Sequence, residues 1–195
     1  MAKGSDMTAP LDDPEFHARI RAGDRTAIKS VVESYLGQIL RAARGAGLDP
    51  HQADDVTQAT FTAFIEAAPR FEGRSSVRTW LFGILYKKIA EARRARDRDR
   101  QMDDIDEVFE RRFDATGKWS RPPLPVDVDL HNKDVQREIF ACLDAAPLRQ
   151  TLAFLLREVE ELSTNDICDI LGVTNTNLGV MLYRVRNRVR ECLEA

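Results

Sequence analysis

Two segments of the chain carry the side chains whose types and spacing could do chemistry. In the first, the adjacent carboxylates Asp54 and Asp55 lie in a helical pattern that is followed by aromatic residues and then arginines. In the second, threonines and asparagines precede four arginines between Arg184 and Arg190. Aromatic rings stack on unpaired bases, arginines contact phosphates, and an asparagine amide matches the edge of adenine. These patterns indicate nucleic-acid binding.

The two adjacent carboxylates could alternatively hold a catalytic metal in a nuclease. Neighbouring residues on a helix point about 100° apart, and no third acid or histidine is placed to complete a site around Asp54 and Asp55. We therefore expect no enzyme activity, no cofactor and no metal. Metal-dependent DNA cleavage that disappears in a double alanine variant would favour the nuclease instead.

The charge of the chain limits the kinds of partner that it can bind. The 195 residues carry a formal net charge of -3, which taken alone argues against a nucleic-acid partner. The charge is segregated, however, because seven basic residues stand against three acidic ones between Lys87 and Arg100. Local basic patches therefore persist. With no long apolar run and no leader of the secretory type, we expect a cytoplasmic protein without direct membrane insertion.

The three cysteines, Cys142, Cys168 and Cys192, are odd in number and widely spaced. They form no C-x-x-C pair and have no histidine cluster nearby, so the sequence predicts free thiols and neither a metal site nor a disulfide.

Helical periodicity dominates, and no segment alternates apolar and polar residues long enough to indicate a strand. The expected fold is all-α, with two small helical domains joined by an extended linker. The predicted parts are a flexible N-terminus (1–12), a first domain (13–98), an acidic and proline-rich linker (99–130) and a second domain (131–195).

The first domain is expected to contain helices at 13–22, 25–43, 52–68 and 76–98, with Asp24 and Ser76 as caps. The third helix should leave four residues at or near an exposed face: Asp54, Asp55, Gln58 and Phe61.

The fourth helix begins with aromatic residues whose role has two interpretations. Phe82 and Tyr86 lie roughly opposite its apolar stripe, and Trp80 lies to one side. They belong either to the core of a helix that is buried on several sides, or to a platform for unstacked bases.

The second domain ends in the most specific local pattern of the chain. Two helices at 131–145 and 147–161 precede Ser163, which caps a short helix; Gly172 makes a turn, and Thr174 caps a final helix that reaches Leu193. A short helix, a glycine turn and a long helix are typical of a helix-turn-helix, although plain helical hairpins share the pattern.

The final helix should bury Leu178, Leu182, Val185 and Val189. Its outward residues are expected to be Thr176, Asn177, Val180, Tyr183, Arg184 and Asn187, with Met181 and Arg188 along one edge. Such a surface is either a DNA reader or a solvated basic face.

Two stretches resemble one protein family. ADDVTQATF, PRFEGRSSVRTWLFGI and ARRARDR resemble region 2 of bacterial RNA polymerase sigma factors, and LREVEELSTNDICDILGVTNTNLGVMLYRVRNRVREC resembles their region 4. Both blocks lie within one short chain with no region 3 between them, which resembles the extracytoplasmic-function (ECF) group.

The resemblance implies roles for matching residues. Contacts with the clamp helices of the largest polymerase subunit would come from Asp54, Asp55, Gln58 and Phe61. The -10 promoter element would be read by Phe71, Arg74, Ser75, Ser76, Arg78, Thr79, Trp80 and Lys87. The -35 element would be read by Thr174, Asn175, Thr176, Asn177, Val180, Met181, Arg184 and Arg188.

Some positions depart from the family pattern. Ala59 stands where an acid is usual, Lys87 where many members have asparagine, and Gly179 and Met181 where basic residues are common. We therefore expect a -35 reader that uses Asn177 and apolar contact between Val180 or Met181 and thymine methyl groups.

The implied partners are core RNA polymerase, through its clamp helices and flap, promoter DNA, and an anti-sigma factor that is either free or membrane-anchored. The alternative from another class is a helix-turn-helix regulator that binds duplex DNA as a dimer without replacing a sigma factor.

Overall fold

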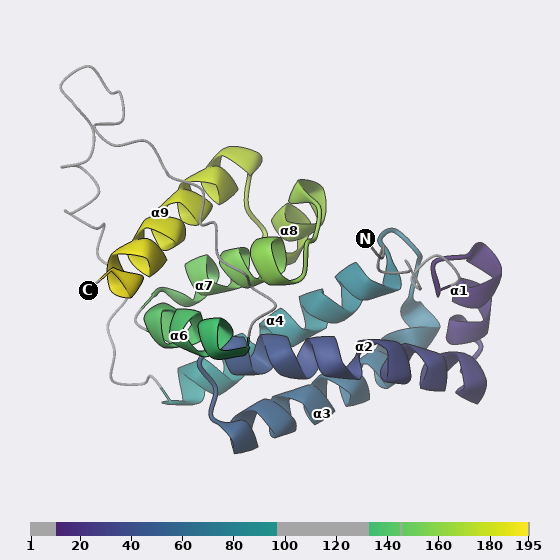
Figure 1. Ribbon diagram of the computed structural model, residues 1–195. Coiled ribbons are helices and arrows are strands. Elements are labelled where there is room, and N and C mark those ends of the chain that lie inside the picture. The colour runs from purple at the N-terminus through teal and green to yellow at the C-terminus, as the bar shows by residue number, and fades with distance from the viewer. Residues whose placement is uncertain (1–10, 97–132, 145, 195) are drawn as a thin grey trace, which may run out of the picture. The chain divides into compact units, whose positions relative to one another are not determined.

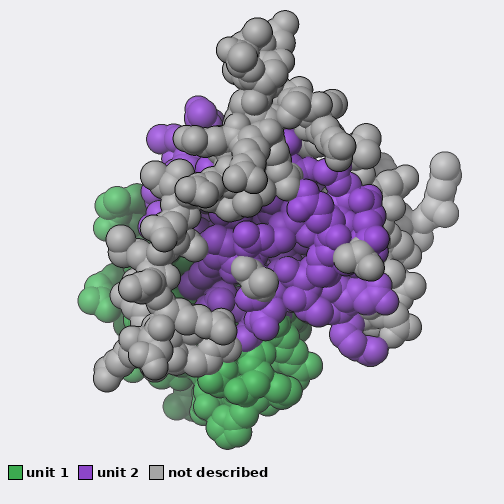
Figure 2. Space-filling view, turned by 90° about the vertical axis from the view of Figure 1, so that its left-hand side faces the viewer, with its two compact units in different colours: residues 1–44, 48–92 green, residues 45–47, 93–195 purple. Residues whose placement is uncertain are grey.

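The computed structural model describes residues 11–96, 133–144 and 146–194, and every regular element in these ranges is a helix (Figure 1). The predicted all-α fold is confirmed. The chain divides into two compact units, Met1–Arg44 with Leu48–Ala92, and Gly45–Gly47 with Arg93–Ala195, coloured separately in Figure 2. The predicted linker, 99–130, lies outside the described residues.

The first unit begins with two helices that start at aspartate caps. Asp13 accepts a hydrogen bond from the backbone of Glu15 at the start of α1 (Pro14–Arg21). Asp24 accepts one from Thr26 at the start of α2 (Arg25–Gly45), as expected. The Arg19 side chain and these backbone N–H groups hold the pKa of Asp24 below its usual value.

The next two helices are also capped locally. Helix α3 (Pro50–Ala67) starts two residues earlier than expected, because Asp49 and Gln52 form a capping box and Pro50 fits the first turn. The single turn η2 (Ala68–Arg70) follows. Helix α4 (Val77–Arg96) begins after Ser76, whose Oγ accepts from the backbone N–H of Thr79 at 3.0 Å.

The core of the first unit comes from α2, α3 and α4, and its largest fully buried side chains include Tyr35, Ile39, Phe64, Leu81, Phe82, Leu85 and Ile89. Phe82, which the sequence places roughly opposite the apolar stripe, is only 1% exposed and belongs to the core. Helix α4 contacts both neighbours: the Trp80 ring meets the ring of Phe64 on α3, and Arg78 Nε donates to Gln38 on α2. It is therefore buried on more than one side, as the core interpretation of its aromatic start proposed.

The second unit contains α6 (Lys133–Asp144), α7 (Leu148–Phe154), α8 (Thr164–Leu171) and α9 (Asn175–Leu193). The helix expected at 147–161 changes to a π-helical turn, η3 (Leu155–Val159). After this turn comes Glu161, a non-glycine residue with φ of 52°.

The helix-turn-helix predicted from the sequence has the expected caps and turn. Ser163 accepts from the backbone of Asp166 before α8, and Thr174 accepts from Asn177 before α9. Between them Gly172 has φ of +64°, a left-handed conformation that glycine adopts without strain.

The prediction of free cysteines is wrong for two of the three. Cys142 of α6 and Cys192 of α9 form a disulfide, while Cys168 is free. Their Cα atoms lie 5.8 Å apart, a separation that suits a disulfide. The packing of α6 on α9 brings together residues 50 positions apart, which the spacing of the cysteines could not reveal.

Within the described ranges, no helix combines the length and apolar character that crossing a membrane requires.

Candidate nucleic-acid and protein interfaces

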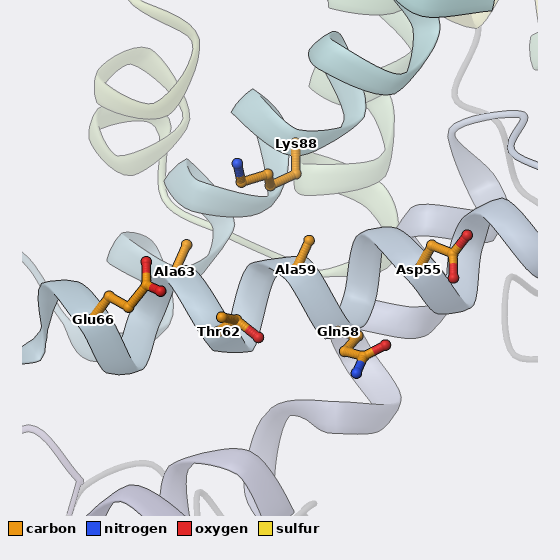
Figure 3. Close-up of a pocket in the computed structure, with 7 residues that line it drawn as sticks. All are labelled: Asp55, Gln58, Ala59, Thr62, Ala63, Glu66 and Lys88. Carbon is orange, nitrogen blue, oxygen red and sulfur yellow. The ribbon is translucent and has the colours of Figure 1, made fainter.

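A shallow groove runs along the exposed side of α3 where α4 passes it (Figure 3). It measures about 340 Å³, and its lining is Asp55, Gln58, Ala59, Thr62, Ala63, Glu66 and Lys88. Figure 3 shows Lys88 on α4 opposite α3, with the small Ala59 and Ala63 on the facing side of α3. Two carboxylates and one amine border an apolar floor, so the groove suits a protein surface that presents both charged and aliphatic groups.

The two acids predicted from the sequence lie at the solvent side of α3. Asp55 lies 3.0 Å from the imidazole of His51, and Asp54 lies 3.8 Å from the guanidinium of Arg44. About two thirds of each carboxylate side chain remains exposed. Ion pairs this exposed are weak, so a partner can replace them at little cost.

Phe61 does not join this surface. It was expected at or near the exposed face, but it is buried, with 7% of its surface accessible. A helix 18 residues long that packs on two neighbours buries more than one stripe, so Phe61 contributes to the core of the first unit.

The loop 71–76 and the start of α4 contain most of the predicted -10 residues, and several of them have structural contacts. The rings of Phe71 and Trp80 stack with centroids 4.6 Å apart, and Phe71 is 4% exposed. Thr79 is also buried, and its Oγ1 lies 2.8 Å from Ser76 Oγ. In this conformation Phe71 and Thr79 support the loop rather than present a surface to a base.

Other predicted -10 residues reach solvent. Arg74 and Lys87 are exposed and Ser75 is half-buried, with Arg74 paired to Glu72 two residues earlier. Arg78 is half-buried, and its Nε donates to the side chain of Gln38 on α2 at 3.1 Å.

The start of α9 presents the polar side chains expected of a DNA reader. Thr174, Asn175, Thr176 and Asn177 are all exposed. Thr174 caps the helix, and Asn175 accepts a hydrogen bond from the thiol of Cys168 on α8 at 3.0 Å. Of these four residues, Thr176 and Asn177 are therefore the two whose side chains are not engaged in such a contact.

The rest of α9 agrees with the expected faces only in part. Val180, Met181, Arg184 and Arg188 are half-buried and border the exposed side, and Gly179 is exposed. Tyr183 and Asn187, both expected to point outward, are buried at 6% and 4% exposure. Since α9 packs against α6, α7 and α8, it buries a wider face than the single stripe predicted.

Arg186 has a partner that the sequence did not indicate. Its Nε donates to Oε1 of Glu158 at 3.0 Å, and this ion pair joins α9 to η3. Glu158 and Arg186 are 28 residues apart, so no local pattern identifies them. In the part of the chain that the structure describes, no group of three or more His, Cys, Asp or Glu residues could hold a metal ion.

Comparison with protein families assigns both units. Sigma-70 region 2 matches residues 31–99, which contain most of α2 and all of α3 and α4. Sigma-70 region 4 matches residues 136–189, which contain α8 and most of α9 of the helix-turn-helix. A "Probable RNA polymerase sigma factor" of Haemophilus influenzae is 30% identical over 159 residues, covering 76% of this chain and 81% of that one. The ECF RNA polymerase sigma factor SigD of Mycobacterium tuberculosis is 30% identical over 178 residues, covering 87% and 78%.

The chain belongs to the ECF sigma factors. Sigma factors are regulatory DNA-binding proteins rather than catalysts. Two solved structures share the fold of this sigma factor. CnrH, solved in complex with the cytosolic domain of CnrY, aligns with a TM-score of 0.67 at 20% identity, covering 94% of this chain and 97% of that one. The sigma factor RpoE of Bartonella quintana, solved with the anti-sigma factor NepR, aligns with a TM-score of 0.63 at 22% identity, covering 86% and 96%.

Proposed function

We propose that this sigma factor binds core RNA polymerase and directs it to promoters, with the first unit at the -10 element and the second at the -35 element. The observation that carries the proposal is that both family regions occur in order and that each unit exposes a polar surface on its matched region. The chain has no reaction of its own; it would act in the cytoplasm by binding, and the polymerase would perform the chemistry.

The groove of α3 is the proposed polymerase-binding surface. Asp54, Asp55 and Gln58 are exposed and supply acceptors for basic and polar groups of the clamp helices. Ala59, where the family pattern has an acid, forms part of the groove lining. We infer that this position admits an aliphatic side chain of the polymerase instead of contributing a charge.

At the -10 element, the proposed DNA contacts come from the residues that remain accessible. Arg74 and Lys87 would contact phosphates, while Ser75 would hydrogen-bond a base or a phosphate of the opened strand. Phe71, Ser76, Arg78, Thr79 and Trp80 would act mainly by shaping the loop. Extracting a base from the stack costs a few kcal/mol, which a preformed loop helps to offset.

At the -35 element, the proposed readers of base edges are Thr176 and Asn177 in the first turn of α9. The exposed Asn177 amide is suited to the N6 and N7 atoms of adenine in the major groove. Val180 and Met181 would add apolar contact with thymine methyl groups, and Arg184 and Arg188 would contact phosphates.

A regulatory partner is part of the proposal. Both solved structures that share this fold contain a second protein. CnrH is bound to the cytosolic domain of CnrY, and the sigma factor RpoE is bound to the anti-sigma factor NepR. By analogy, an anti-sigma factor would cover the exposed polymerase-binding and DNA-binding surfaces of this chain. A pulldown from the native host that returns polymerase subunits and no such regulator would contradict this part.

The test uses purified chain, sigma-free core polymerase and a library of randomised promoters. Asn177→Ala should relax the preference at one -35 position by roughly 1 to 3 kcal/mol without altering the -10 preference.

Asp55→Ala combined with Gln58→Ala should weaken holoenzyme assembly while leaving helix content unchanged, and Glu33→Ala on α2 is the exposed control. A footprint on a palindrome without polymerase would support a helix-turn-helix regulator instead.

A further inference from the structure

The N-terminal segment of the first unit contacts the loop 71–76 from a distant part of the chain. Oδ1 of Asp12 accepts a hydrogen bond from the backbone N–H of Val77 at 2.8 Å, although the two residues are 65 positions apart. Val77 is the first residue of α4, so Asp12 satisfies one of the N–H groups that a helix start leaves without an internal partner.

Asp12 and Ser76 divide this capping between them. Ser76 accepts from the N–H of Thr79, and Asp12 accepts from the N–H of Val77. A carboxylate at this end of a helix also interacts favourably with the helix dipole. The start of α4 is therefore held both by its own loop and by the segment that precedes α1.

His17 of α1 packs against the same loop. Its ring meets the Phe71 ring edge-on with centroids 4.9 Å apart, and Phe71 in turn stacks on Trp80. His17 Nδ1 lies 3.2 Å from the place that a Cβ would occupy on Gly73, so the imidazole lies close against the loop backbone. Nε2 of His17 lies 3.6 Å from Asp12 Oδ1, which links the two contacts.

We propose that Asp12 and His17 are positioning residues for the -10 loop. They fix the loop 71–76 and the first turn of α4 so that Arg74 and Ser75 face the promoter strand. The inference rests on the proposed function and deepens it, because it assigns to α1 a part in promoter opening. A loop that is already ordered loses less conformational entropy when it captures a base, so opening is favoured.

Two substitutions of Asp12 separate its hydrogen bond from its charge. Asp12→Ala removes the acceptor for the Val77 N–H, whereas Asp12→Asn retains an amide oxygen that can accept it. His17→Ala removes the ring that packs on Phe71 and Gly73. Arg21→Ala, an exposed position at the end of α1, is the matched control.

The first measurement is promoter opening by holoenzyme, followed through the permanganate reactivity of unpaired thymines. The probe is a promoter that the wild-type chain selects from the randomised library. Asp12→Ala should reduce opening by about tenfold, the range expected from loss of a helix cap. His17→Ala, which removes ring packing instead of a cap, should also reduce it. Asp12→Asn and Arg21→Ala should stay near wild type, and holoenzyme assembly and binding to the -35 duplex should not change.

The second measurement reports on the loop without transcription. Trp80 becomes the only tryptophan when Trp119→Phe is introduced into the full chain. In that background, Asp12→Ala and His17→Ala should shift Trp80 emission to longer wavelength as the Phe71 stack loosens, whereas Arg21→Ala should not.

The outcomes distinguish this inference from the proposed function. The inference would be overturned if Asp12→Ala and His17→Ala left both promoter opening and Trp80 emission unchanged. It would also be overturned if every Asp12 variant lost promoter opening and -35 binding to the same extent. Failure of the wild-type holoenzyme to start at specific sites would instead overturn the proposed function.

Discussion

Arg186 of α9 and Glu158 of η3 form an ion pair in which Arg186 Nε donates to Glu158 Oε1 at 3.0 Å. The Arg186 side chain is 35% exposed and the Glu158 side chain is 27% exposed, so the pair is neither fully solvated nor fully buried. It fixes α9 to the turn that precedes the helix-turn-helix, and it engages a guanidinium that the sequence alone would assign to a DNA phosphate.

The first prediction concerns this pair. Glu158→Ala and Arg186→Ala should each lower the free energy of unfolding by about 1 kcal/mol, as measured by urea denaturation. The double variant should lower it by little more than either single variant, because both remove the same ion pair. Arg186→Ala should weaken binding to a -35 duplex less than Asn177→Ala. A larger loss of DNA affinity from Arg186→Ala than from Asn177→Ala would show that Arg186 leaves Glu158 to bind DNA.

The second prediction concerns the disulfide between Cys142 and Cys192. It closes a loop across 50 residues, and a cross-link of that size stabilises a folded chain by about 2 to 4 kcal/mol, chiefly by restricting the unfolded state. Cys142→Ser should lower the urea midpoint, and reductant should lower the midpoint of the wild type but not that of Cys142→Ser. Cys168→Ser, at the free cysteine, should retain the response to reductant. A wild-type midpoint that is insensitive to reductant would contradict the prediction.

The third prediction compares two glycines of the helix-turn-helix. A Cβ on Gly179 would meet no atom within 4 Å, so Gly179→Ala should stabilise α9 by up to about 1 kcal/mol. Gly172 also has open space, but its φ of +64° strains any residue with a Cβ, so Gly172→Ala should destabilise the chain by about 1 kcal/mol. Thermal denaturation of both variants checks the opposite signs, and destabilisation by Gly179→Ala would show that a contact is missing from this account.

The fourth prediction concerns the groove of α3. Ala59→Trp should fill its floor and weaken the affinity for core polymerase at least tenfold, about 1.4 kcal/mol, because the indole would occupy the space of a partner side chain. Ala18→Trp, at an exposed alanine of α1, is the matched control. Competition for core polymerase with a labelled sigma factor measures both, and equal affinities would place the polymerase contact elsewhere on the chain.

The capping residues and the helix-turn-helix could be predicted because their signals are local. Asp24, Ser76 and Thr174 each cap a helix within three residues of their own position, and Gly172 sits where a left-handed turn is needed. Such patterns depend on nearby backbone groups and need no knowledge of tertiary contacts.

The burial of several site residues could not be predicted in the same way. Phe61, Tyr183 and Asn187 are buried because their helices pack on more than one neighbour, whereas a periodic pattern reveals a single apolar stripe. The Cys142–Cys192 disulfide and the Asp12–Val77 hydrogen bond join positions 50 and 65 residues apart. Contacts of this range follow from the fold and leave no spacing signal in the sequence.

The sigma-factor function is tested most directly by mapping transcript start sites from a randomised promoter library, using sigma-free core polymerase with and without this chain. A sigma factor should give specific starts only when the chain is present, and the active promoters should share a -35 and a -10 element at fixed spacing. Start sites that are the same with and without the chain, under conditions in which a known sigma factor is active, would contradict it.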